Sequence, residues 1–187
     1  MRNPDTTRDC AFRSRWDRPS PFVVCHLCQP SMSFTRRHLP HWIPEETAIF
    51  VTWRLAGSLP DRAQPGPLWL QDERVACVVS NALLYGETIR RHYRLHAWVV
   101  MPNHVHAIFQ PCIAMSTIMR WLKGRTGRVA NQILGRTGMP FWQDESFDHW
   151  VRSAEELLGL IEYVESNPVK AGLVEAKEQW RWSSAAG

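Results

Sequence analysis

The 187-residue chain lacks any run of about 18 consecutive apolar residues, so we expect no membrane-spanning helix. Its N-terminus carries charges but has no apolar signal core, which argues against a secreted protein. The five cysteines are odd in number and irregularly spaced, a pattern that fits a reducing cytosol better than a disulfide framework. These three absences predict a cytoplasmic protein with no membrane partner.

Helical and strand periodicity are both missing from residues 1–31, which are rich in Arg, Asp, Pro and Ser. We interpret this segment as a disordered or loosely attached extension and residues 32–187 as a single domain. Cys25 and Cys28 form a C-x-x-C pair inside the extension. The rest of the chain offers only a poor second half for a zinc site, so we interpret them as free thiols.

A mildly basic balance, with a net charge of +4 and a pI near 9.0, favours a polyanionic partner. The segment 116–134 reads as a helix with no acidic residue and a basic outer surface. That surface is either a phosphate-binding strip or an ordinary solvated face, and the missing acidic residues favour the strip. The candidate phosphate contacts are Arg120, Lys123, Arg125 and Arg128, together with Arg36 and Arg37 before the first predicted strand.

Alternation and helical spacing divide the domain into strand, helix, strand, strand, helix, strand and a final helix. The order predicts an α+β fold: a ferredoxin-like βαββαβ antiparallel sheet with two helices on one face, followed by a C-terminal helix. The predicted ranges are 48–55, 70–93, 95–101, 103–110, 116–134, a last strand region made of 141–143 and 147–152, and a last helix that begins after Ser153 and ends at Pro168.

The motif Met101-Pro102-Asn103-His104-Val105-His106 joins two short apolar runs through a Pro-Asn turn signal. Because residues two apart on a strand face the same way, His104 and His106 project side by side. Two imidazoles about 6.6 Å apart at their Cα atoms can converge on one cation. The pair is either a metal site on a rigid strand or only a polar strand face.

The final helix buries an apolar stripe and has Ser153 and Glu156 as a capping box. Tyr163 and Asn167 lie one turn apart on one flank of this helix, whereas Glu162 and Glu165 fall toward the solvated side. If that flank meets the histidines, a tyrosine hydroxyl lies beside a metal. The alternative is a half-buried tyrosine without a catalytic role.

The histidine motif resembles the His-hydrophobic-His motif of the HUH tyrosine transposases. The run Tyr163-Val164-Glu165-Ser166-Asn167-Pro168-Val169-Lys170-Ala171-Gly172-Leu173-Val174 resembles their catalytic-helix signature. Further similarity lies in 36–42, 50–60, 147–152 and 180–184. The branch that the chain most resembles is the transposases associated with repetitive extragenic palindromes (REP elements) in bacteria.

This resemblance implies that His104 and His106 hold Mg²⁺ or Mn²⁺, that Asn167 is a third metal ligand, and that Tyr163 attacks a DNA phosphodiester. It implies single-stranded or hairpin DNA as the substrate, a covalent 5′-phosphotyrosine intermediate, and a nucleoid-associated monomer or homodimer. Two other functions stay open: a non-catalytic nucleic-acid-binding module, and a replication- or mobilisation-type HUH nickase.

Overall fold

A computed structural model of the chain describes residues 47–58 and 66–186. Three predictions lie outside the described residues: the extension 1–31, the free thiols of Cys25 and Cys28, and the phosphate contacts of Arg36 and Arg37. Within the described part of the chain, no helix is both long and apolar enough to span a bilayer.

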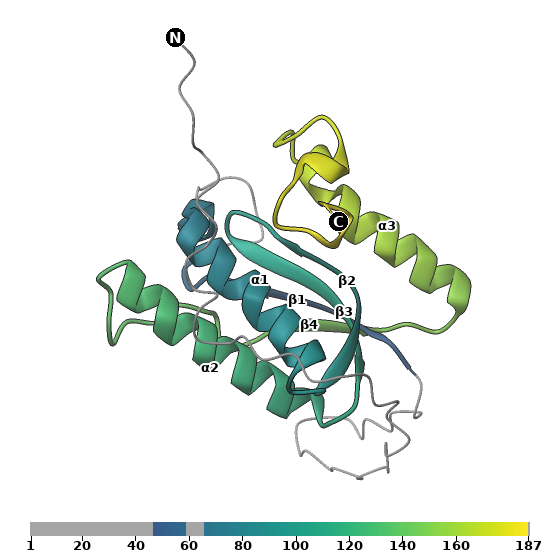
Figure 1. Cartoon of the computed structure of the whole chain (residues 1–187), viewed down its shortest axis with the longest axis horizontal. Coiled ribbons are helices and arrows are strands. Elements are labelled where there is room, and N and C mark those ends of the chain that lie inside the picture. Colours follow the sequence, from purple (N-terminus) through teal and green to yellow (C-terminus); the bar gives the residue numbers. More distant parts are fainter. Residues whose placement is uncertain (1–46, 59–65, 187) are drawn as a thin grey trace.

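The chain forms a four-stranded sheet and three helices, followed by short helical turns near the C-terminus (Figure 1). The strand order is β2-β3-β1-β4 and every neighbouring pair is antiparallel, which confirms the predicted ferredoxin-like α+β fold. The elements are β1 (Ile49–Arg54), η2 (Trp69–Gln71), α1 (Glu73–Thr88), β2 (Tyr93–Val100), β3 (His104–Pro111), α2 (Met115–Ile133), β4 (Phe147–Trp150), α3 (Ala154–Lys170), η3 (Lys177–Gln179) and η4 (Ser184–Ala186).

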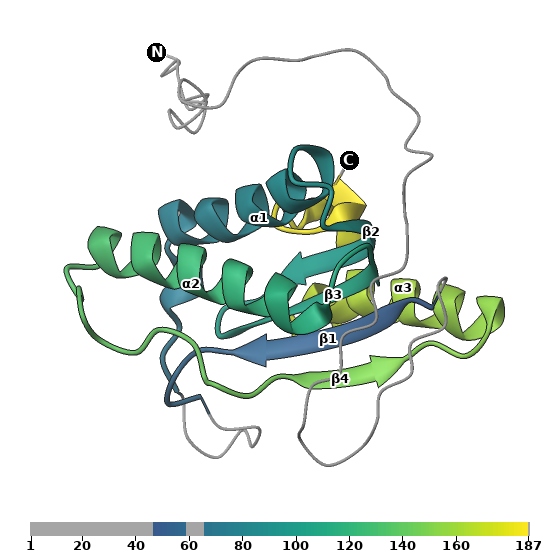
Figure 2. The same cartoon turned by 90° about the horizontal axis from the view of Figure 1, so that it is seen from below.

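Two hydrophobic cores lie on opposite faces of this sheet because side chains alternate along each strand. Val51 of β1 and Val105 of β3 belong to the core beneath α1 and α2. Phe50 of β1 and Ile108 of β3 belong to a smaller core with Val164 of α3. Helices α1 and α2 therefore cover one face and α3 covers part of the other, as Figure 2 shows from below.

The predicted helix 70–93 was too long at its C-terminal end, because α1 ends at Thr88. A turn follows in which Arg91 has φ of 53°, and the chain enters β2 at Tyr93. The Tyr93 hydroxyl donates to the Leu83 carbonyl at 2.8 Å, so the ring packs beneath α1 from the neighbouring strand. Its place in the helical pattern was accidental, and Ile89 on the same predicted stripe is 55% exposed.

Helix α3 begins as predicted, because Ser153 Oγ accepts a hydrogen bond from the Glu156 amide at 3.1 Å. Its predicted end at Pro168 was wrong, since the helix continues to Lys170. A proline in the last turn removes only one helical hydrogen bond, which the structure tolerates there. The helix ends before Gly172, whose φ of 68° favours a residue without a Cβ and whose amide donates to the Val169 carbonyl at 2.9 Å.

Candidate active site

His104 and His106 lie side by side on β3, facing the side of the sheet on which α3 packs. Their Nε2 atoms are 3.1 Å apart, so the two rings converge from Cα atoms that lie farther apart along the strand. The other ring nitrogens have partners as well: His104 Nδ1 is 2.6 Å from Asn103 Oδ1, and His106 Nδ1 is 2.6 Å from the Thr52 hydroxyl. Both rings are therefore fixed at two points, with their Nε2 atoms directed toward each other.

Burial keeps both imidazoles neutral in this arrangement. It lowers the pKa of His104 to about 4, with a further contribution from the nearby positive charge of Arg54. It lowers the pKa of His106 to about 3, with further contributions from His104 and Arg54. Two neutral imidazoles retain the lone pairs that a metal ligand needs at physiological pH.

The separation of the two Nε2 atoms also fits a shared divalent ion. An ion held at about 2.1 Å by two nitrogens at right angles places those nitrogens about 3 Å apart, close to what the pair shows. Because the Asn103 amide oxygen can only accept, it holds the proton of His104 on Nδ1 and leaves Nε2 as a lone-pair donor. The residues present therefore fit a metal that prefers nitrogen and oxygen ligands.

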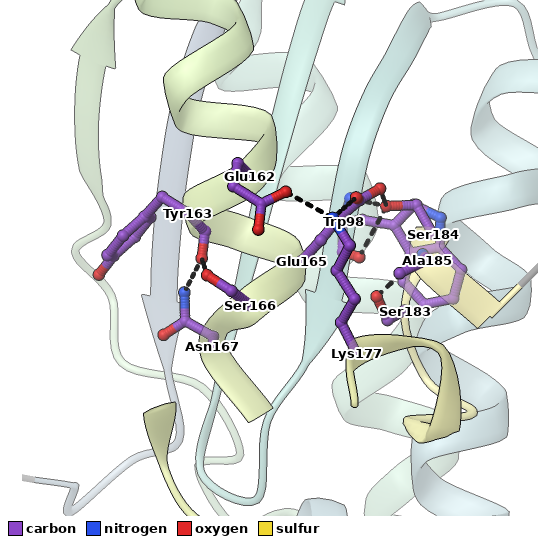
Figure 3. A network of polar contacts seen from close by, with 10 residues as sticks. All are labelled: Trp98, Glu162, Tyr163, Glu165, Ser166, Asn167, Lys177, Ser183, Ser184 and Ala185. Carbon is purple, nitrogen blue, oxygen red and sulfur yellow. Dashed lines mark hydrogen bonds and ion pairs between the residues drawn. The ribbon is translucent and has the colours of Figure 1, made fainter. Parts of the chain in front are cut away.

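A third ligand from His, Cys, Asp or Glu is absent among the described residues. Asn167 was the predicted third ligand, and its Nδ2 donates to the Tyr163 carbonyl at 2.7 Å within α3 (Figure 3). This bond uses the amide nitrogen and leaves the Oδ1 atom as the available acceptor. Asn167 makes no hydrogen bond with either histidine, so its role as a metal ligand stays a prediction.

Tyr163 meets the histidines through its ring. Its ring centroid lies 5.8 Å from that of His106 and 6.0 Å from that of Phe50, both in edge-on contacts. The side chain is 41% exposed, so a substrate can reach it. Lys170 Nζ lies over the same ring, 4.8 Å from its centroid. The flank of α3 that carries Tyr163 thus meets the histidine face of the sheet at His106.

The other two tyrosines of the chain lie on the opposite face of the sheet. Tyr93 is buried in the core beneath α1. Tyr85, on α1, stacks against Trp121 and has the Arg125 guanidinium over its ring. Tyr163 is therefore the only one of the three tyrosines on the histidine face.

Two residues of β1 that the sequence interpretation missed complete the site. Thr52 and Arg54 pair with His106 and His104, respectively, and alternate with the buried Val51 and Trp53. The same alternation that predicted β1 could have identified them, but only the strand register shows which partners they face. Arg54 is partly exposed and brings a positive charge to the pair, where an attacked phosphate would need one.

A C-terminal segment anchors α3 to the sheet (Figure 3). Lys177 forms ion pairs with Glu162 and Glu165, and the Ser184 hydroxyl donates to Glu165 at 3.0 Å. The Trp180 indole donates to the Val100 carbonyl of β2, also at 3.0 Å. Glu165 therefore does not face solvent as the helical projection predicted, because this segment folds back over it.

The basic strip on α2 lies on the face away from the histidines, and its members differ. Lys123 Nζ donates to the carbonyls of Gln143, Asp144 and Glu145 at 3.0 to 3.1 Å. These bonds use all three ammonium protons, so Lys123 holds a loop and has none left for a phosphate. Arg120 and Arg128 are exposed. Their contact with DNA stays a prediction, as does that of Arg125, which lies over the Tyr85 ring.

Comparison with known proteins found a matching family model and a similar curated protein. Residues 81–167 match the model of the family described as "Transposase IS200 like". The REP-associated tyrosine transposase of Escherichia coli (strain K12) is 28% identical over 96 residues. The chain is similar to this transposase family and to the REP-associated protein. The resemblance predicted from the sequence is thereby confirmed, although the alignment covers only 50% of this chain and 55% of that relative.

One solved structure agrees on the fold. The structure described as the REP-associated tyrosine transposase bound to a REP hairpin aligns with a TM-score of 0.58 and 23% identity over 82% of each chain. A putative transposase from Deinococcus radiodurans aligns with a TM-score of 0.43 and 17% identity, over 72% of this chain and 97% of its own, too weakly to support any inference. His104, His106, Tyr163 and Asn167 all lie inside the IS200-like region, whereas Thr52 and Arg54 precede it.

Proposed function

We propose that this protein is a metal-dependent enzyme that cuts and rejoins single-stranded DNA at hairpin, REP-like elements, through a 5′-phosphotyrosine on Tyr163. The observation that carries the proposal is the convergence of two fixed, neutral imidazoles with the ring of an accessible tyrosine. Each feature alone has an ordinary structural explanation. Together they support the proposal, because they would supply the ligands, the nucleophile and the access that phosphodiester transfer needs.

His104 and His106 would hold Mg²⁺ or Mn²⁺ through their Nε2 atoms, with Asn167 Oδ1 as the candidate third ligand. When bound, the ion would polarise the scissile phosphate and orient it for attack. Thr52 and Asn103 fix the two rings from behind, so the imidazoles need not reorganise when they bind the ion. Arg54 adds positive charge on the same face, which would help to offset the charge of the phosphate.

Tyr163 would supply the attacking oxygen. Its Oη–P bond forms as the P–O3′ bond of the DNA breaks; the phenolic proton is lost and the departing 3′ oxygen gains a proton. The free phenol has a pKa near 10, so attack at neutral pH needs the polarised phosphate described above. A phenolate leaves more readily than an alkoxide, so a DNA 3′-hydroxyl can attack the phosphotyrosine in turn. The reaction then ends in strand rejoining.

Single-stranded and hairpin DNA is the substrate class that we propose. The REP-associated tyrosine transposase of known structure was solved with a REP hairpin bound to it, and the present chain has a similar fold. The net charge of +4 suits a polyanionic partner. A non-catalytic binding module would account for the charge but would leave the histidine pair and Tyr163 together unexplained. A replication- or mobilisation-type nickase would share the chemistry but not the IS200-like match.

Cleavage of a labelled single strand with a hairpin and unpaired flanks tests this function. We expect nicking by the wild-type protein in Mn²⁺ or Mg²⁺, none in excess chelator, and none by His106→Ala. His96→Ala is a matched control. His96 lies on the neighbouring strand β2 and is neither a proposed metal ligand nor the proposed nucleophile. Full cleavage in chelator would remove the metal from the mechanism. Binding without cleavage on every single-stranded substrate would favour the binding module.

A further inference from the structure

Phe147 begins β4 at the edge of the sheet and is an unusual residue to find exposed there. Its side chain is 63% exposed. It lies on an edge strand of the sheet, where its large apolar ring is left in solvent. Its neighbours are residues of the candidate active site.

The strand register places Phe147 in line with the candidate active site. Thr52 of β1 pairs with Phe147 on one side and with His106 on the other. Residues directly opposite each other on paired strands project to the same face, so all three side chains point to the face that carries Tyr163. The exposed ring therefore lies two strands from the histidine pair and on the same surface.

Phe50 links this ring to the nucleophile. Its ring stacks on His106 at a centroid distance of 5.5 Å, and it meets Phe147 at 6.4 Å and Tyr163 at 6.0 Å, both edge-on. Phe50 itself is buried, so it supports the two exposed rings and leaves them accessible. Helix α3 packs mainly over β2 and β3 and touches β4 through the ion pair between His149 and Glu156, whereas Phe147 stays exposed.

We propose that Phe147 is a stacking platform for one unpaired nucleobase of the DNA strand, next to the phosphate that Tyr163 attacks. Bases stack on exposed aromatic rings in single-strand binding sites, and every base has a face suited to this contact. The charges nearby fit the same occupant: Arg54 lies beside the histidines and Lys170 lies over the Tyr163 ring. A phosphate held between those charges would place a neighbouring base over β4.

This inference rests on the proposed function, because it supposes single-stranded DNA at the Tyr163 site. It adds a binding residue that the histidine and tyrosine motifs do not contain. Phe147 also lies outside α2, so the stacking would be independent of the basic strip. The contact would hold the strand in register and need not select one base, since stacking tolerates all four.

Equilibrium binding of a fluorescent hairpin with unpaired flanks tests the platform in the full-length protein. We expect Phe147→Ala to weaken binding by at least about fivefold, and Phe147→Trp to retain it. Ile89→Ala is the matched control, because Ile89 is 55% exposed on the opposite layer of the fold. An affinity for Phe147→Ala within twofold of that of the wild type would overturn the proposal.

An abasic scan of the unpaired nucleotides shows whether the contact is with a base. One abasic position should weaken wild-type binding as much as Phe147→Ala does, and the alanine variant should lose nothing more on that strand. A 2-aminopurine at the same position should be quenched on binding to the wild type but not to the variant. If every abasic position weakens binding equally, Phe147 does not stack on a base. The scan uses the wild type, so it decides the question even if Phe147→Ala does not fold.

The outcomes also separate this inference from the proposed function. If the wild type forms a covalent adduct with DNA and Phe147→Ala binds equally well, only the stacking platform is wrong. If the wild type binds no single-stranded DNA at all, both the platform and the proposed function are wrong.

Discussion

Replacing Thr52 by valine isolates the contribution of the residue behind the histidine pair. Its hydroxyl lies 2.6 Å from His106 Nδ1, and both side chains are buried. Valine keeps the volume and removes only the hydroxyl, which leaves a buried ring nitrogen without a partner. That loss costs about 1–3 kcal/mol of stability, and the loss of a residue that orients a metal ligand lowers metal affinity or activity by about 10- to 100-fold.

Titration with Mn²⁺, monitored by calorimetry or by the paramagnetic resonance of the ion, measures the change in metal affinity directly. We expect Thr52→Val to bind Mn²⁺ about 10- to 100-fold more weakly and to regain much of its cleavage when Mn²⁺ is raised. Thr52→Ser retains the hydroxyl and should bind as the wild type does. If Thr52→Val binds Mn²⁺ normally while His106→Ala does not, Thr52 has no part in orienting the ligand.

The remaining predictions concern α2 and the core. Replacing Arg120 and Arg128 with alanine should flatten the slope of log affinity against log salt by about 1.4 for single-stranded DNA, and an unchanged slope would make them a solvated surface. Gly86→Ala should lower the free energy of unfolding by about 1–3 kcal/mol, because the new Cβ would lie 2.1 Å from the Tyr93 hydroxyl. Gly124→Ala, with no atom within 4 Å, should cost nothing in the same denaturant titration.

Much of the fold could be predicted because local signals and tertiary structure agree. The alternation of β1, the hairpin that carries His104 and His106, and the Ser153 cap of α3 each depend on neighbours close in sequence. Where a side chain finds its partner far along the chain, the local pattern misleads. Tyr93 fits the helical period of α1 but packs against it from β2.

The candidate site was predicted only where its chemistry is local. The His-x-His spacing and the Tyr163–Asn167 flank predict candidate ligands and a candidate nucleophile within single elements. Thr52 depends on the pairing of strands 54 residues apart in sequence, which no local pattern shows. For the basic strip, the sequence predicted a phosphate contact at Lys123 that its surroundings do not favour. The composition of α2 cannot reveal that Lys123 already donates to three carbonyls.

A denaturing gel of protein mixed with labelled hairpin-flanked single-stranded DNA and Mn²⁺ tests the central claim most directly. The account predicts a covalent adduct with the wild type, with Tyr85→Phe and with Tyr93→Phe. It predicts none with Tyr163→Phe, which keeps the ring contacts with His106 and Phe50 and should fold and bind the DNA as the wild type does. An adduct that persists in Tyr163→Phe would contradict the account, since the nucleophile would then be another residue.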